Sequence, residues 1–351
     1  MPKTNPRPKV SILCRTYNQE EVIGVAIQSA LNQTFHDFEL IISDDASTDN
    51  TYSRILKFQD PRIRIIRNSE NRGAPANLNL CMTEAIGEYV SILDGDDEYL
   101  PQKLAKQVEF LDKNPDYGAV FSYIGTIGDQ KNPKILKNSL LFKKLLNNPG
   151  GTRAQMFRKC FGTGTFLAFP SEMFRRKYAV YFPEHVLALS ETNFHLSLLS
   201  HTKLHVLEEP LVNYRVVANY TNKWSSVQSL ASELYFILDR FLEIKDVSFF
   251  KEVFKNDLDG SELLTEPLLA YALTKIAEKD PDKRQWANYN FHRFISNPDN
   301  YILLKDKLGL THKDILTVKR GFIAPGKSPD QRTTKKILKW IVSLCPWWRK
   351  T

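Results

Sequence analysis

The first half of the chain alternates strand-like and helix-like segments, and this alternation limits the possible fold more than any other feature. Apolar runs typical of buried strands occur at residues 10–14, 38–42, 63–67 and 89–93. Helical spacing or helix-capping residues occur between them, at residues 20–32, 52–58 and 77–85. Strands alternating with helices at these intervals predict an α/β fold, with a mainly parallel sheet that carries helices on both faces.

The rest of the chain is expected to be less regular and then helical. We predict a helix at 100–112, a strand at 119–123, an irregular loop region over the site at 128–160 and a short strand at 166–169. Beyond residue 225 strand signals fade, and helices are predicted at 229–242, 261–277 and 286–295. These patterns predict three regions: a domain at 1–222, a helical C-terminal extension at 223–330 and a basic amphipathic tail at 331–351.

Charge and cysteine content narrow the class of protein. The chain has 351 residues and a net charge of +8, which suits anionic partners such as nucleotides, phosphorylated substrates or lipid surfaces. Nucleic acid is not expected among them. The four cysteines form no CxxC pair, which argues against a zinc site or a disulfide framework. The sequence shows no signal-peptide pattern and no run of ~20 apolar residues, so we expect the protein in the cytoplasm.

Polar clusters follow three of the predicted strands, at residues 15–18, 43–45 and 94–97. Parallel sheets bind ligands at the carboxyl ends of their strands, so these clusters are expected to converge on one edge. The third cluster, in LDGDDE, packs carboxylates so closely that they need a positive neighbour. Mg²⁺ and Mn²⁺ prefer such oxygen ligands, and the ion keeps open positions that diphosphate oxygens can fill. A solvated acidic turn is the alternative.

Two longer stretches, residues 10–51 and 87–115, resemble family-2 glycosyltransferases of the GT-A type. The resemblance is strong to about residue 125, thinner to about 220 and absent from the helical region. It implies a Rossmann-like GT-A fold and an inverting hexosyl- or N-acetylhexosaminyltransferase that uses a nucleotide-sugar, a UDP-sugar first, and Mn²⁺ or Mg²⁺. The acceptor would be a glycan or a lipid-linked molecule in surface polysaccharide synthesis.

The resemblance also implies roles for individual residues. Arg15, Thr16 and Tyr17 would line the base pocket, with Tyr17 stacking on uracil. Asp45 would accept the uracil imide hydrogen while Asp44 shapes the turn. The other nucleotide-side positions are Glu20, Asn77 and Asp94, with Asp94 at the ribose or the diphosphate, and the metal would contact Asp96 or Asp97. Elementary chemistry agrees, because a flat ring needs an aromatic platform and a diphosphate needs a cation. The alternative for Tyr17 is a rim aromatic packed on the sheet.

The chain departs from the family pattern at the position of the general base. Relatives carry Glu-Asp on a later helix, and here Thr192 replaces the Asp. Threonine cannot act as a base at neutral pH, so Glu191 is the candidate catalytic base. The alternative is an idle carboxylate that follows a Ser190 cap at a helix start.

Further departures concern the diphosphate side of the expected site. Leu78 stands where relatives often place an arginine, and the resemblance implies that Asn77 and Asn79 would serve instead, with Arg72 as a source of charge. Asn219 stands where relatives often place a metal-binding histidine. His195 and His205 are predicted to be core or surface residues rather than metal ligands.

The C-terminal tail, residues 332–351, is basic and carries apolar residues on one helical face, with tryptophans near its end. This combination predicts peripheral attachment to an anionic membrane surface, on the inner face of the cell membrane. The alternative is a helix that docks on the protein's own body.

Two other functions compete with sugar transfer. A nucleotidyltransferase also has an α/β sheet and an acidic metal site, but it needs a glycine-rich phosphate loop after the first strand. Here RTYNQEE follows, and no glycine occurs until Gly24. The second alternative is a catalytically impaired relative that binds a sugar nucleotide. This alternative remains because Thr192 replaces the Asp that serves as the base in relatives.

Overall fold

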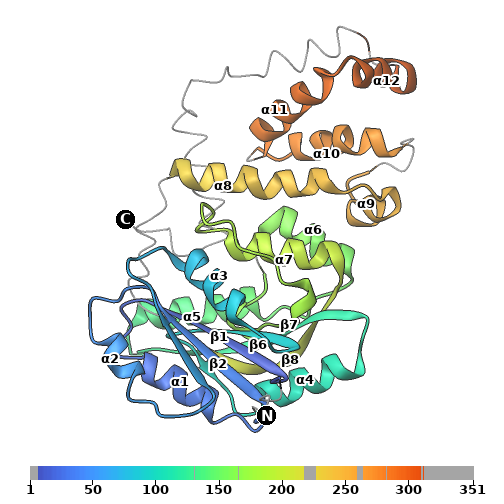
Figure 1. Cartoon of the computed structure of the whole chain (residues 1–351). Coiled ribbons are helices and arrows are strands. Elements are labelled where there is room, and N and C mark those ends of the chain that lie inside the picture. Colours follow the sequence, from blue (N-terminus) through green and yellow to red (C-terminus); the bar gives the residue numbers. More distant parts are fainter. Residues whose placement is uncertain are drawn as a thin grey trace, which may run out of the picture. The chain divides into compact units, whose positions relative to one another are not determined.

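A computed structural model describes residues 7–129, 131–164, 166–216, 227–258, 264–281, 283–309 and 311 of the chain. Contacts between residues divide the chain into two compact units, Met1–Trp224 and Ser225–Thr351 (Figure 1). The tail at 331–351 and Asn219 lie outside the described residues. Within the described part, no helix has the length and apolar character that crossing a membrane requires.

The N-terminal unit is built on a sheet that has eight strands among the described residues, in the order β3-β2-β1-β4-β7-β6-β8-β5. The strands are β1 (Val10–Thr16), β2 (Phe38–Asp44), β3 (Ile63–Arg67), β4 (Tyr89–Asp94), β5 (Glu98–Tyr99), β6 (Tyr117–Ile127), β7 (Met173–Arg175) and β8 (Lys203–Arg215). The run β3-β2-β1-β4 is parallel, as the sequence predicted. β7 pairs antiparallel with β4 and β6, so the whole sheet is mixed.

Burial explains why the first strands form the centre of the sheet. Every residue of β2 is buried, and Val10, Ile12 and Leu13 of β1 have no exposed surface. Continuous apolar runs of this kind suit strands that are covered on both faces. The helices of this unit are α1 (Ile23–Leu31), α2 (Thr51–Ile55), α3 (Ala74–Glu84), α4 (Lys103–Lys113), α5 (Pro133–Leu146), α6 (Arg153–Thr163) and α7 (Ser190–His201). Figure 1 shows α1 and α4 on one side of the sheet and α3 and α7 on the other.

The predicted loop region at 128–160 is wrong, because this stretch forms α5 and α6. The Asn132 side chain accepts a hydrogen bond from Lys134 N at 3.0 Å and caps α5, with proline in its first turn. A reciprocal capping box between Thr152 and Gln155 starts α6. Apart from Asn138 in the middle of α5, the Asn, Pro and Gly residues that suggest a loop therefore lie at or between the helix ends.

Two strand predictions also need correction. Residues 166–169 are not a strand, because Ser171 N donates to Ala168 O at 3.0 Å and closes a 3₁₀ turn at Phe169–Ser171. The strand comes next, as β7. The long strand β8 was not predicted, because Glu208, Glu209 and Pro210 interrupt its apolar pattern. It pairs in parallel with β6, with a shift in register near that interruption.

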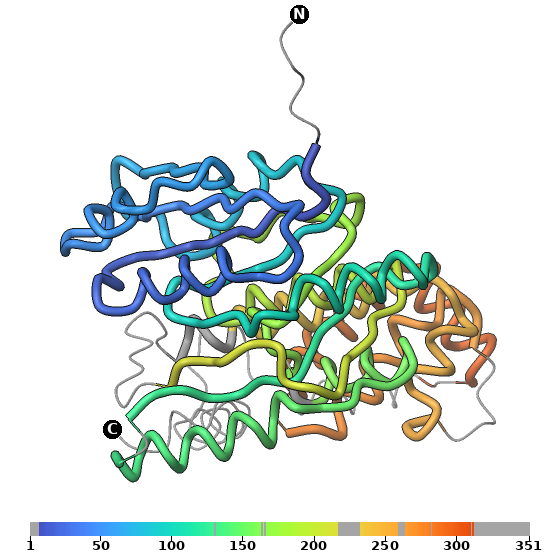
Figure 2. The backbone as a smooth tube through the Cα atoms, turned by 90° about the horizontal axis from the view of Figure 1, so that it is seen from below, coloured from blue at the N-terminus to red at the C-terminus, as the bar shows by residue number. Residues whose placement is uncertain are grey.

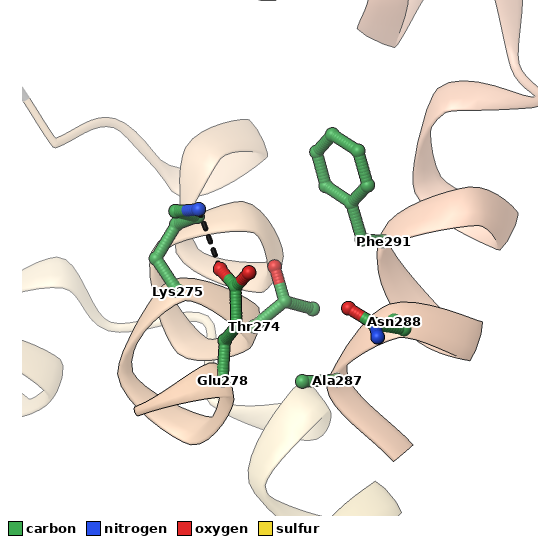
Figure 3. Close-up of a pocket in the computed structure, with 6 residues that line it drawn as sticks. All are labelled: Thr274, Lys275, Glu278, Ala287, Asn288 and Phe291. Carbon is green, nitrogen blue, oxygen red and sulfur yellow. Dashed lines mark hydrogen bonds and ion pairs between the residues drawn. The ribbon is translucent and has the colours of Figure 1, made fainter. Parts of the chain in front are cut away.

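The described part of the C-terminal unit is helical, as expected. It contains α8 (Val227–Asp239), α9 (Val247–Val253), α10 (Leu269–Glu278), α11 (Arg284–Ile295) and α12 (Pro298–Leu308). Leu268, Phe291 and Leu304 form a core cluster, and Trp286 Nε1 donates to Asp239 Oδ1 at 2.8 Å. A hollow between α10 and α11 is lined by Thr274, Lys275, Glu278, Ala287, Asn288 and Phe291 (Figure 3). The volume of this hollow is about 10 Å³, which is room for one water and far too little for a nucleotide-sugar.

Candidate active site

The acidic loop Asp94–Glu98 leaves the carboxyl end of β4 in a tight turn. Asp97 N donates to Asp94 O at 3.0 Å, and Gly95 N donates to Arg15 O at 3.1 Å. A side chain on Gly95 would collide with Gln19 and with Thr16. Glycine is therefore required between the aspartates, because the loop lies directly against the end of β1.

Arg15 is the first positive group among these carboxylates. Its Nε donates to Asp94 Oδ1 at 2.5 Å, and its Nη2 lies 3.3 Å from Asp94 Oδ2. The two residues are opposite each other in the parallel register of β1 and β4. The Arg15 side chain thus points toward the acidic loop, and its predicted place in the base pocket remains a prediction.

Arg215, at the end of β8, is the second positive group, and the sequence analysis missed it. Its backbone N donates to Asp97 Oδ1 at 2.7 Å, and its Nε donates to Asp96 O at 2.7 Å. Its Nη2 donates to Glu98 Oε1 at 2.8 Å. The available signal was an arginine that ends an apolar run, but without β8 it could not be placed.

The two arginines leave part of the negative charge unbalanced, and this charge fits a divalent cation. Burial, and then the charge of Asp94, raise the pKa of Asp96 to about 6. Asp97 Oδ2 is buried without a hydrogen-bond partner, and burial raises the pKa of Asp97 well above its usual range. Among the described residues, no group of three or more His, Cys, Asp or Glu side chains is arranged to hold a metal. A cation on Asp96 and Asp97 would thus need further oxygens, which a diphosphate has.

Glu191 reaches the same edge from the first turn of α7. Its Oε1 lies 3.4 Å from Nη2 of Arg15, and its side chain keeps 34% of its surface exposed. Partial burial raises the pKa of Glu191, Arg15 opposes the shift, and Asp94 adds to it. The Ser190 cap that belongs to the alternative role of Glu191 is absent: the Ser190 hydroxyl donates to Leu187 O at 3.4 Å, and Leu189 is the N-cap residue. Thr192 is buried at 1% exposure.

A buried hydrogen bond between side chains anchors the helix that carries Glu191. His195 lies one turn further along α7, and its Nε2 is 3.0 Å from Glu172 Oε2, with both side chains at 1% exposure or less. Burial raises the pKa of Glu172, and His195 opposes that shift. His195 is therefore a core residue, as the sequence predicted. His205 stacks on Phe110 with ring centroids 4.3 Å apart.

The end of β1 and the loop after it carry Thr16, Tyr17 and Glu20, three of the residues predicted to bind the nucleotide, and this loop is hydrogen-bonded to the loop after β2. Tyr17 is 42% exposed, and no ring contact or hydrogen bond of its side chain occurs among the described residues. Thr16 is buried, and its hydroxyl donates to Gln19 Oε1 at 2.7 Å. Glu20 Oε2 accepts a hydrogen bond from Asn50 N at 3.0 Å and so ties the two loops together. Tyr17 is free to act as a platform, whereas Thr16 and Glu20 brace the loops.

Asp45 and Asn77 have structural partners. Asp45 is 2% exposed and accepts hydrogen bonds from Asn68 Nδ2 at 2.6 Å, Arg72 N at 3.0 Å and Gly73 N at 2.9 Å. Asn77 Nδ2 donates to Ser43 O at 3.0 Å inside the protein. These bonds use most of the polar atoms of both side chains. Their predicted contacts with a nucleotide remain predictions.

Two other polar residues at this edge also have structural partners. Asp44 shapes the turn, as predicted, by accepting from Ser47 N at 3.3 Å. Asn79 pairs with the backbone N and O of Phe182, each at 2.8 Å.

Comparisons with known proteins agree with this architecture. The model of "Glycosyl transferase family 2" matches residues 11–179. The uncharacterized glycosyltransferase MJ1057 of Methanocaldococcus jannaschii is 30% identical over 66% of this chain and 79% of its own length. The putative glycosyltransferase EpsE of Bacillus subtilis is 38% identical over 40% of this chain and 53% of its own length. The Escherichia coli UDP-Glc:alpha-D-GlcNAc-diphosphoundecaprenol beta-1,3-glucosyltransferase WfgD is 38% identical over 30% of this chain and 42% of its own length. The chain thus spans about half the length of two of these three relatives.

Solved structures support the fold. TarS 1–349 of Staphylococcus aureus, in complex with UDP-GlcNAc, has a TM-score of 0.56 at 18% identity, covering 87% of this chain and 93% of that one. The mannosyltransferase PcManGT of Pyrobaculum calidifontis, in complex with GDP-Man and Mn²⁺, has a TM-score of 0.52 at 17% identity. The match covers 99% of this chain and 89% of PcManGT. The N-terminal unit therefore has the GT-A fold, and the chain belongs to glycosyltransferase family 2.

Proposed function

We propose that the chain transfers a sugar from a UDP-sugar to a hydroxyl of a glycan or lipid-linked acceptor, with inversion, in surface polysaccharide synthesis. One observation carries this proposal: Glu191 lies 3.4 Å from the guanidinium that also binds Asp94. An inverting transfer needs a proton acceptor close to the group that binds the donor. The donor and acceptor classes are supported by WfgD, whose name gives UDP-Glc and a diphosphoundecaprenol-linked acceptor.

The proposed reaction is a single displacement. The acceptor oxygen bonds to the anomeric carbon of the sugar as the bond from that carbon to the diphosphate oxygen breaks. Glu191 takes the proton of the acceptor hydroxyl, because it is the residue of the Ser190–Asn193 segment whose side chain can accept a proton at neutral pH. Its partial exposure leaves room for an acceptor. Arg15 holds the carboxylates of Glu191 and Asp94 in fixed relation.

The donor would be held by the acidic loop and by Tyr17. Asp96 and Asp97 would hold Mn²⁺ or Mg²⁺, which when bound neutralises charge on the departing diphosphate. The unpaired buried oxygen of Asp97 and the raised pKa of Asp96 support this assignment. Tyr17 would stack on the uracil ring.

Membrane attachment is proposed to be peripheral, through the basic tail at 331–351. Family membership argues against a nucleotidyltransferase, and the placement of Glu191 argues against an impaired relative that only binds sugar nucleotides.

A donor panel tests the proposal. The purified full-length chain is incubated with UDP- and GDP-sugars and Mn²⁺, and nucleotide release and the thermal midpoint are measured. We expect one or a few UDP-sugars to raise the midpoint and to be hydrolysed slowly without acceptor. Pyrophosphate release from a nucleoside triphosphate and a sugar phosphate, with no response to any nucleotide-sugar, would contradict the proposal.

A further inference from the structure

Helix α5 exposes apolar and basic side chains together on its outer face. Its inner face is buried through Ile135, Ser139 and Phe142, and Phe142 lies against the Tyr214 ring at 5.4 Å between centroids. On the other side, Leu136 is 44% exposed and Leu140, one turn later, is 64% exposed. Large apolar side chains exposed together in this way require an explanation.

Lysines surround these two leucines. Lys134, Lys137, Lys143 and Lys144 are all exposed, and α5 has no acidic residue. None of these lysines forms an ion pair within the part of the chain that the structure describes. Helical spacing places Lys137 and Lys144 on the same side as Leu140. The outer face of α5 is therefore amphipathic and cationic at once.

The start of α5 lies at the same sheet edge as the acidic loop. The helix begins shortly after the end of β6, where Ile127 pairs with Arg215, the residue that braces Asp96 and Asp97. Gly128 allows this close turn, because a side chain there would collide with Val216 O. Figure 2 shows α5, in green, along the outer margin of the N-terminal unit beside β6.

Charge complementarity indicates which partner can bind the outer face of α5. A second copy of the chain, paired through the same face, would set lysines against lysines. The chain's own segment 332–351 is also basic and has no acidic residue, so it would be repelled in the same way. An anionic lipid surface complements both features, because phosphates attract the lysines and the acyl boundary takes up the leucines.

We propose that α5 docks the N-terminal unit on an anionic lipid bilayer, with Leu136 and Leu140 entering the interface and the lysines contacting the headgroups. The docking would set the sheet edge that carries the acidic loop near the bilayer. Its use in catalysis rests on the proposed function, since a lipid-linked acceptor presents its reacting end at such a surface. The docking itself is testable without turnover.

Sedimentation of the full-length chain with vesicles tests the docking. Vesicles of phosphatidylcholine with phosphatidylglycerol are compared with vesicles of phosphatidylcholine alone. The double variants Leu136→Gln/Leu140→Gln and Lys137→Gln/Lys144→Gln should each lower binding to the anionic vesicles about tenfold or more. The control Leu56→Gln/Lys57→Gln, an exposed pair after α2, should bind like the parent. Added salt should weaken the parent more than the lysine variant.

Hydrogen exchange locates the contact with the bilayer, and the thermal midpoint shows whether each variant is folded. Backbone amides of residues 133–146 should exchange more slowly in the parent with anionic vesicles, and both variants should keep the parental thermal midpoint. Parental binding by both α5 variants, or unchanged exchange at 133–146, would overturn the proposal. Transfer to a water-soluble acceptor should survive in both variants. If the parent transfers no sugar but the α5 variants still lose vesicle binding, the proposed function fails and the docking stands.

Discussion

Arg15 and Glu191 are 176 positions apart in the sequence, yet Nη2 of Arg15 lies 3.4 Å from Oε1 of Glu191. The same guanidinium holds Asp94 at 2.5 Å and lies 5.2 Å from the centre of the Phe169 ring. β1 and β4 fix the place of Arg15 and Asp94, and α7 supplies Glu191. Arg15 therefore sets the distance between the acidic loop and the candidate base.

Removing the guanidinium should slow transfer more than it weakens nucleotide binding. Arg15→Met should lower kcat by ~10–100-fold, because small errors in the placement of reacting groups are costly. UDP affinity should change by less than about threefold, and Arg15→Lys should recover only part of the rate, since lysine cannot hold two carboxylates in the fork geometry of arginine. Arg62→Met, which removes an ion pair to Asp60, is the control. If UDP affinity falls in step with kcat, Arg15 contacts the nucleotide instead.

Metal dependence should follow from Asp96. Calorimetry with UDP should show binding in Mn²⁺ that weakens strongly in EDTA, because two carboxylates and a diphosphate share the cation. Asp96→Ala should remove the difference between the two conditions. Asp116→Ala, at a side chain that is 76% exposed, should behave like the parent. Equal UDP affinity with and without metal in the parent would refute the metal assignment.

The raised pKa of Asp96 predicts how stability depends on pH. Its pKa in the folded protein is about 6, above the usual 3.8, so the folded state holds this proton more tightly than the unfolded chain does. That stabilisation is complete below pH 3.8 and is lost as the pH rises through 6. Asp96→Asn should therefore raise the free energy of unfolding by ~1–3 kcal/mol at pH 8 without metal, and by little at pH 4. Urea unfolding at both values checks this, and an equal gain at both would point to packing instead.

The parallel half of the fold could be predicted because each of its strands is a local apolar run, as β2 shows. The strand β8 could not, because two glutamates and a proline interrupt its pattern and its partner residues in β6 lie 85 to 88 positions earlier, as Ala119 with Leu204 and Ile127 with Arg215 show. The helices α5 and α6 could not be predicted, because their capping residues are of the types that also form loops. Local composition predicts elements well when one segment contains the whole signal.

The acidic loop could be predicted for the same reason, since its carboxylates are neighbours in sequence. The partners of its charges could not. Arg15 lies opposite Asp94 because of the register of β1 and β4, and Arg215 belongs to β8, a strand that could not be predicted from the sequence. The carboxylate of Asp45 is of the right type to accept an imide hydrogen, but in the structure it accepts hydrogen bonds from the backbone N–H groups of Arg72 and Gly73. Such contacts depend on how distant segments pack.

Tyr17 should contribute to nucleotide affinity without contributing to stability. Tyr17→Ala should weaken UDP binding by ~1–3 kcal/mol, which is the scale of a lost stack between a base and an aromatic ring. Its exposure predicts an unchanged free energy of unfolding. Tyr181→Ala, at a residue that is 64% exposed, is the control. Unchanged UDP affinity in Tyr17→Ala would place the base pocket elsewhere.

Proton transfer to Glu191 is the step on which the proposed mechanism depends, and a single substitution tests it. Glu191→Gln keeps the shape of the side chain and removes its basicity, and Glu184→Gln, at an exposed site, is the matched control. Sugar transfer to acceptor is measured for both variants with saturating UDP-sugar and Mn²⁺, together with their UDP affinity. Glu191→Gln should lose ~10²–10⁴-fold in kcat at parental UDP affinity, the usual contribution of a general base. Transfer by Glu191→Gln at the parental rate would show that Glu191 is not the base.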